Sequence, residues 1–131
     1  MALSYKDSTG NYWLDQLYDN KFPASSLLQI RTGAPAGPNS AAGGSLLAEI
    51  TLPATPFAAA SAKTKAKSGT WSVAASGTGT AAHFRLKNAG DTEREEGTVT
   101  ATGGGGDMTL DNTSNASAQV VTISTYSRTA P

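Results

Sequence analysis

The sequence predicts an all-β fold, namely an antiparallel β-sandwich of the jelly-roll kind with about seven or eight short strands, preceded by a short helix. Three observations predict it. Thr, Ser, Ala and Gly dominate the 131 residues, and small β-tolerant residues suit tightly turned sheets. Short apolar runs alternate with clusters of Gly, Pro, Asn and Asp from Ser26 onward. Helical spacing of large apolar residues stands out only before Pro23. We therefore expect an N-terminal helical arm over residues 1–25 and a β-sandwich domain over residues 26–131.

A short helix is predicted over residues 11–20, which hold three of the nine aromatic residues. Its apolar residues recur at helical spacing. Ser8 or Thr9 would cap its start, and Pro23 would stop it soon after its end. The apolar stripe packs on the chain's own sheet, or it forms an arm that docks on a neighbouring subunit, and both alternatives stay open. The side chains that would serve such docking are Tyr12, Trp13, Leu17 and Tyr18.

Alternation of apolar and polar residues predicts the first strands. Ser26–Arg31 places Leu28 and Ile30 on one face, and Leu46–Leu52 alternates in the same way. The stretch 33–40 is rich in Gly and Pro and is predicted to be a loop.

Three lysines recur at every second position, namely Lys63, Lys65 and Lys67. A strand here would present three positive charges on one face, which protects an edge strand against unwanted pairing. The same face would suit an acidic partner, so these lysines form our second group of candidate partner-binding residues.

The second half of the chain predicts further strands over Thr70–Ala75, Ala81–Lys87, Glu96–Thr102, Asp107–Asp111 and Ala118–Thr129. Trp71 and Phe84 are expected in the core. The stretch Asn88–Glu96 is predicted to be a charged turn. Gly103–Gly106 is predicted to be the loop of a hairpin.

Charge and composition exclude several classes of function. The formal net charge is zero, from 10 basic and 10 acidic residues, whereas nucleic-acid binding needs a positive surface. No apolar run is long enough for a membrane span, and no signal peptide is recognised. There are no cysteines, so disulfides and zinc–thiolate sites are excluded. Charged residues are 15% of the chain, against about a quarter in a typical soluble domain, which favours a protein packed against neighbours.

The sequence offers no set of residues for catalysis or for a cofactor. His83 is the only histidine, and its place on the polar face of a predicted strand favours a surface or interface residue. The acidic group Asp91, Glu93, Glu95 and Glu96 has the side chains for paired-carboxylate chemistry or calcium, but its place in a polar turn favours a solvated loop. We expect no enzyme activity, no cofactor and no metal site.

The order of several segments resembles a group of small virion proteins encoded by tailed phages and prophages. These segments are Leu28–Pro35, Gly44–Pro53, Ala66–Trp71, Gly79–Leu86 and Gly97–Thr113. They extend over most of the chain but leave out the part around Trp13. The resemblance implies a structural rather than a catalytic protein.

Within that group, a capsid decoration or cement protein suits the composition best. The resemblance implies that its partner is the major capsid protein or another virion protein, that it forms a homo-oligomer (a dimer or trimer), and that it is made and assembled in the host bacterial cytoplasm. A tail, neck or fibre-associated protein is the first alternative. A carbohydrate-binding module for the host surface is the second, and it would need solvent-exposed aromatic residues on the β region, for which Trp71, Phe84 and Tyr126 are the candidates.

Overall fold

A computed structural model describes residues 3–131. Its helix α1 spans Asp7–Lys21, so it is longer at both ends than predicted. Asp7 lies in its first turn and Lys21 in its last, where each charge interacts favourably with the helix dipole. Gly10, Leu14 and Tyr18 form the buried stripe, at the four-residue spacing that places side chains on one face of a helix.

Short strands make up most of the remaining chain. They are β1 (Leu27–Arg31), β2 (Leu46–Thr51), β3 (Thr64–Ala66), β4 (Ser72–Ala74), β5 (Gly79–Thr80), β6 (His83–Lys87), β7 (Arg94–Ala101), β8 (Met108–Leu110), β9 (Ser114–Asn115), β10 (Val120–Thr122) and β11 (Ser127–Thr129). Five of them form one curled sheet in the order β2-β1-β6-β7-β8. The others pair in three two-stranded ribbons, β10-β4, β11-β3 and β5-β9.

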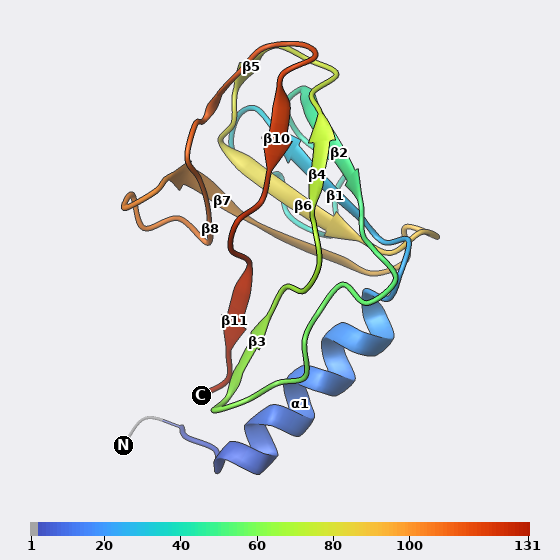
Figure 1. The fold of residues 1–131 in the computed structure, drawn as a ribbon, viewed down its shortest axis with the longest axis vertical. Helices are drawn as coiled ribbons and strands as arrows, with labels where there is room; N and C mark the ends of the chain where they lie inside the picture. The colour runs from blue at the N-terminus through green and yellow to red at the C-terminus, as the bar shows by residue number, and fades with distance from the viewer. Residues whose placement is uncertain (1–2) are drawn as a thin grey trace.

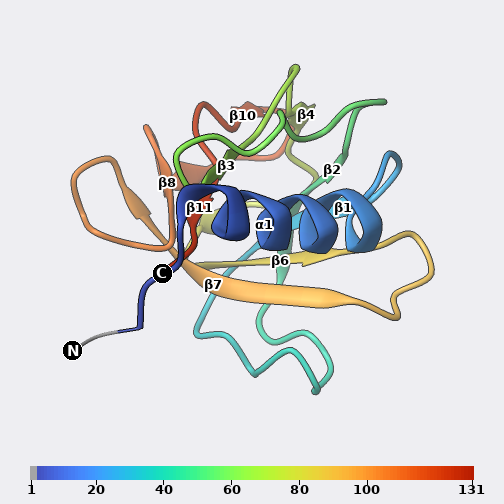
Figure 2. The ribbon, with the colours of Figure 1, turned by 90° about the horizontal axis from the view of Figure 1, so that it is seen from below.

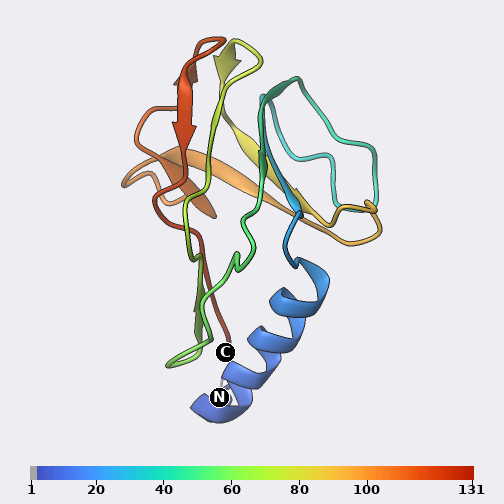
Figure 3. The ribbon, with the colours of Figure 1, turned by 45° about the vertical axis from the view of Figure 1, so that its right-hand side comes forward.

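The β10-β4 ribbon and the helix lie at opposite ends of the molecule (Figure 1). The β10-β4 ribbon stands at the top of that view, and the β11-β3 ribbon runs down beside α1 at the bottom. From below, α1 crosses in front of the curled sheet (Figure 2). The loop between β1 and β2 extends to the side away from the ribbons (Figure 3).

The mostly β fold with one N-terminal helix is confirmed, but the sheet differs from the predicted jelly-roll-like antiparallel sandwich. Strands β7 and β8 pair in parallel, with Val99 opposite Met108 and Ala101 opposite Leu110, so the sheet is mixed. The prediction of a hairpin at Gly103–Gly106 was therefore wrong. Parallel neighbours usually need a connection of about a dozen residues, but here residues 102–107 suffice because the chain makes a tight coil.

Two hydrogen-bonded rungs fix that coil. Asp107 Oδ2 accepts from the backbone N–H of Thr98 at 3.0 Å, and Thr102 Oγ1 donates to Asp111 Oδ1 at 3.0 Å. Each rung joins residues nine apart, the same offset as the strand pairing between them. Gly103 and Gly105 adopt positive φ angles of 88° and 80°, a conformation that glycine reaches without a Cβ penalty.

One hydrophobic core joins the helix to the sheet. Leu14, Tyr18 and Phe22 belong to the same buried cluster as Trp71 and Phe84. The core therefore crosses the boundary predicted between residues 25 and 26, and α1 packs on the β-strands of its own chain.

Candidate interaction surface

Lys65 attaches α1 to strand β3. Its ammonium lies 2.7 Å from Asp15 Oδ1 and 2.9 Å from Asp19 Oδ1, and its side chain is 1% exposed. Burial disfavours the charged forms, but the hydrogen bonds outweigh it, so that the pKa of Lys65 is raised and that of Asp15 is lowered. Asp15 and Asp19 are four residues apart and lie on one side of the helix, which allows a single lysine to bridge them.

Glu95 forms a second junction between the helix, the sheet and the C-terminal segment. Its carboxylate accepts hydrogen bonds from the hydroxyls of Tyr18 at 2.5 Å and of Tyr126. Arg128 Nη2 lies 3.0 Å from the same carboxylate, and its guanidinium lies 4.2 Å from the centre of the Tyr126 ring, within the range of a cation–π contact.

Burial and the negative charge of Glu95 both raise the pKa of the Tyr18 and Tyr126 hydroxyls. Both groups therefore remain protonated donors over the ordinary pH range. Burial opposes the charged form of Arg128, but the neighbouring Tyr126 and Glu95 raise the pKa of its guanidinium. The helix junction thus includes two tyrosine hydroxyls that stay protonated and a guanidinium that stays charged.

The outer face of α1 carries aromatic side chains that this packing leaves exposed. Tyr12 is 67% exposed and Trp13 is 47% exposed. Trp13 meets Tyr5 edge to face, with ring centres 5.8 Å apart, and Leu17 is half-buried beside the core. We call Tyr12 and Trp13, together with Tyr5 just before the helix, the aromatic face. Large aromatic side chains exposed on a firmly held element are typical of docking surfaces.

Only some of the residues predicted to bind a partner lie on this surface. Tyr12 and Trp13 do, and Leu17 lies at its edge. Tyr18 is buried and bonded to Glu95, and Lys65 is buried beneath the helix, so neither is placed to meet a partner in this structure. The helix period shows why: Tyr18 lies on the buried stripe, whereas Trp13 lies outside it.

The three lysines do not share one exposed strand face. Lys63 adopts a positive φ of 60°, and its ammonium donates to the carbonyls of Tyr5 and Pro131. Lys67 donates to the carbonyl of Gly69 and lies over the Trp71 ring. The predicted row of three free charges was therefore wrong, because a helix distant in sequence covers β3 and because the backbone bends at Lys63.

Further polar groups serve the loop between β1 and β2. The buried Arg85 pairs with Glu96 and also donates to the carbonyls of Gly37 and Ser40. His83 is fully buried rather than at the surface, and its Nδ1 lies 2.7 Å from the carbonyl of Gly33. The loop that the sequence predicted is thus anchored to the sheet.

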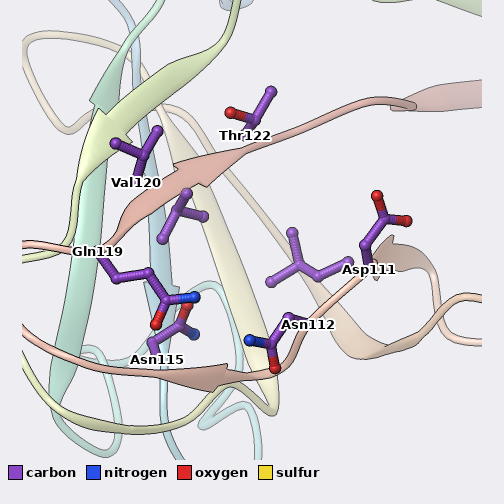
Figure 4. A pocket seen from close by; sticks show the side chains of 8 residues that line it. Asp111, Asn112, Asn115, Gln119, Val120 and Thr122 are labelled. Atoms are coloured by element: carbon purple, nitrogen blue, oxygen red, sulfur yellow. The ribbon is translucent and has the colours of Figure 1, made fainter.

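Shallow depressions lie on the surface of the described residues. One of about 170 Å³ lies between β10 and residues 110–115 and is lined mostly by amide, hydroxyl and valine side chains (Figure 4). Another, of about 320 Å³, lies beside the turn between β6 and β7. Within residues 3–131, no three His, Asp or Glu side chains gather as metal ligands would, and α1 is too short and too polar to span a bilayer.

Comparisons of this chain with protein-family models, with curated proteins and with solved structures found no match. The resemblance to small virion proteins therefore rests on the segments quoted above.

Proposed function

We propose that this chain is a non-enzymatic structural protein of a tailed-phage particle, and that it decorates and cements the capsid. In this role it binds the outer surface of the major capsid protein and bridges neighbouring capsomers. Many copies with modest contacts then act together, so that no single contact needs to be tight. The protein assembles in the host bacterial cytoplasm, and neither nucleic acid nor a membrane is its partner.

The observation that carries the proposal is the aromatic face of α1. Tyr12 and Trp13 are exposed on a helix that Lys65 and Glu95 hold in place. A preorganised aromatic surface loses little conformational freedom on binding. The zero net charge and the low content of charged residues support the same conclusion, because they reduce repulsion between closely packed copies.

Two alternatives differ in what they require. A tail, neck or fibre-associated protein would use the same surface in fewer copies. A carbohydrate-binding module was expected to expose aromatic residues on its β region, but Trp71, Phe84 and Tyr126 are at most 2% exposed. We therefore keep the particle protein as the proposal.

The copy number of the protein in purified particles tests the proposal. Quantitative mass spectrometry would compare it with the major capsid protein. A number of copies close to that of the capsid protein supports the cement role. A few copies per particle would move the protein to the tail, neck or fibres, and absence from the particle would overturn the structural role altogether.

A paired variant tests the surface itself. The double substitution Tyr12→Ala with Trp13→Ala should abolish incorporation into particles and leave the fold intact, because both side chains are exposed. Gln16→Ala, on the exposed side of the same helix, is the matched control and should incorporate normally. Normal incorporation of the double variant would exclude the aromatic face as the docking surface.

A further inference from the structure

The turn before β3 has a strained backbone. Ser61 and Thr64 exchange backbone hydrogen bonds of 3.0 and 2.9 Å, so Ala62 and Lys63 alone form the loop of this small hairpin. Both adopt positive φ angles, of 49° and 60°. Such turns strongly favour Asn and Gly, because a Cβ atom disfavours the left-handed region. Residues persist in this conformation only where the surrounding structure imposes it, and they cluster at functional sites.

Contacts with α1 and with the C-terminal segment impose the turn. The N–H of Lys63 donates to Asn11 Oδ1 at 2.8 Å, and its carbonyl accepts from the N–H of Ala130 at 2.9 Å. The stem of the Lys63 side chain lies over Gly10, where a Cβ atom would come within 2.7 Å of Lys63 Cγ. The missing side chain at Gly10 therefore leaves room for Lys63 to pack on the helix.

The ammonium of Lys63 reaches the segment that precedes α1. It donates to the carbonyl of Tyr5 at 3.1 Å and to that of Pro131 at 3.3 Å. The N–H of Tyr5 donates to the same Pro131 carbonyl at 2.7 Å. The C-terminal segment, the turn before β3 and the start of α1 thus meet at the bottom of the molecule (Figure 1). The backbone of Tyr5 is held there through both its N–H and its carbonyl group.

This network determines where the Tyr5 ring lies. Tyr5 is half-buried against the core, and its ring meets Trp13 edge to face with ring centres 5.8 Å apart. Because Tyr5 precedes the first residue of α1, Asp7, the hydrogen bonds of the helix do not fix it. The bonds to Lys63 and Pro131 do so instead, and they thereby complete the aromatic face.

We propose that Lys63 is a positioning residue for the aromatic face, because it holds the segment before α1 so that the Tyr5 ring stays against Trp13. This role rests on the proposed docking function of that face. A surface that is ordered before binding loses less conformational freedom on association. Lys63 therefore strengthens docking without touching the partner.

A direct contact between Lys63 and an acidic partner explains the structure less well. Its ammonium already donates to two carbonyls of its own chain, so the charge is used within the molecule. A lysine on an ordinary surface loop would present a free charge without any backbone strain. The positive φ angle of Lys63 and the room left by Gly10 both serve to place its side chain toward Tyr5.

The substitution Lys63→Met tests the positioning step in the free, full-length chain. It keeps an unbranched side chain and removes the ammonium. Nuclear Overhauser contacts between the rings of Tyr5 and Trp13 should be lost, while the circular dichroism spectrum shows an intact fold. Lys67→Met is the matched control, because the ammonium of Lys67 donates to the carbonyl of Gly69, away from the aromatic face. These ring contacts should remain in the control.

Incorporation into particles tests the consequence for docking. In competition with the wild-type chain, the share of Lys63→Met in particles should fall about tenfold, which corresponds to about 1.4 kcal/mol of binding free energy. The share of Lys67→Met should not fall. Tyr5→Ala should show a similar loss, and adding Lys63→Met to it should cause no further loss, because both changes act through the same ring. A lysine that bound the partner itself would add its own loss.

Several results would overturn the proposal. One is that Lys63→Met retains the ring contacts in the free chain, and another is that it adds a further loss to Tyr5→Ala. Lost ring contacts with normal incorporation would also overturn it, provided that Tyr12→Ala with Trp13→Ala fails to incorporate. Normal incorporation of that double variant would instead mark a failure of the proposed docking surface, and the positioning role would fall with it.

Discussion

The two ends of this molecule are held together in different ways. At the helix end, formed by α1, β3 and β11, charged residues such as Lys65, Glu95 and Arg128 make directional contacts between elements. At the ribbon end, formed by β4, β5, β9 and β10, residues 68–84 and 112–127 contain no Asp, Glu, Lys or Arg. Backbone pairing and small side chains hold that end.

This difference shows which end of the molecule depends on contacts between individual charged side chains. The ion pairs at the helix end form only when α1 lies in one position, and they leave few of the charged groups there unpaired. The neutral β10-β4 ribbon is held by backbone pairing, and residues 110–115 of the same chain lie across a small depression from β10. The helix end is therefore expected to respond strongly to substitution and to pH, whereas the ribbon end is expected to respond little to pH.

The largest effect is expected at the aromatic junction between the two ends. Trp71 is fully buried and contacts Phe57 and Tyr126. Trp71→Ala should lower the free energy of unfolding by roughly 3–5 kcal/mol, because it leaves a large cavity in the core. Chemical denaturation measures this change. A loss below about 1 kcal/mol would mean that the side chain is exposed.

A smaller effect is expected from the polar junction at the helix end. Glu95→Ala removes the acceptor of two tyrosine hydroxyls and of Arg128, and should cost about 2 kcal/mol because these groups lose a charged partner. The matched control is Glu93→Ala, whose ion pair with Lys21 is exposed and should contribute about 0.5 kcal/mol or less. Equal losses in the two variants would contradict the role given to Glu95.

The third effect develops only at alkaline pH. The pKa values of Tyr18 and Tyr126 in the folded chain are raised above 10.0. Their contribution to stability is therefore complete below pH 10 and is lost as the pH rises through the folded values. Denaturation curves recorded across that range should show a decline that is reduced in Tyr18→Phe with Tyr126→Phe. An unchanged decline would assign it to other groups.

The smallest effect on stability is expected at the exposed face of strand β10. Thr122→Lys should change the free energy of unfolding by no more than about 0.5 kcal/mol, because the side chain is exposed. Chemical denaturation measures this change, and a large loss of stability would show that the side chain is constrained within the chain.

The alternation of apolar and polar residues along the sequence was sufficient to predict several strands. The predicted strands at 26–31, 46–52 and 81–87 correspond to β1, β2 and β6, and the alternation of apolar and polar residues indicated them. It did not indicate that the polar residues of β6, such as His83 and Arg85, are buried as well.

Contacts between distant segments could not be predicted from such patterns. The spacing of the lysines gave no sign that Asp15 and Asp19, about fifty residues away, would bury Lys65. The parallel direction of β8 relative to β7 depends on the two hydrogen bonds between residues nine apart. The spacing of apolar residues does not indicate these bonds. Tyr12 and Trp13 were identified as candidates, but their exposure depends on which stripe of α1 faces the sheet.

The nine-residue coil between β7 and β8 also limits how this protein tolerates changes in length. Inserting one residue among Gly103–Gly106 would separate Thr98 from Asp107 and would turn the buried Met108 and Leu110 outward, because a strand reverses its faces with each one-residue shift. An epitope tag placed there should misfold the sheet edge. The turn between β6 and β7 joins an antiparallel pair of strands and takes no part in these two hydrogen bonds. It is therefore the better site for grafting a peptide.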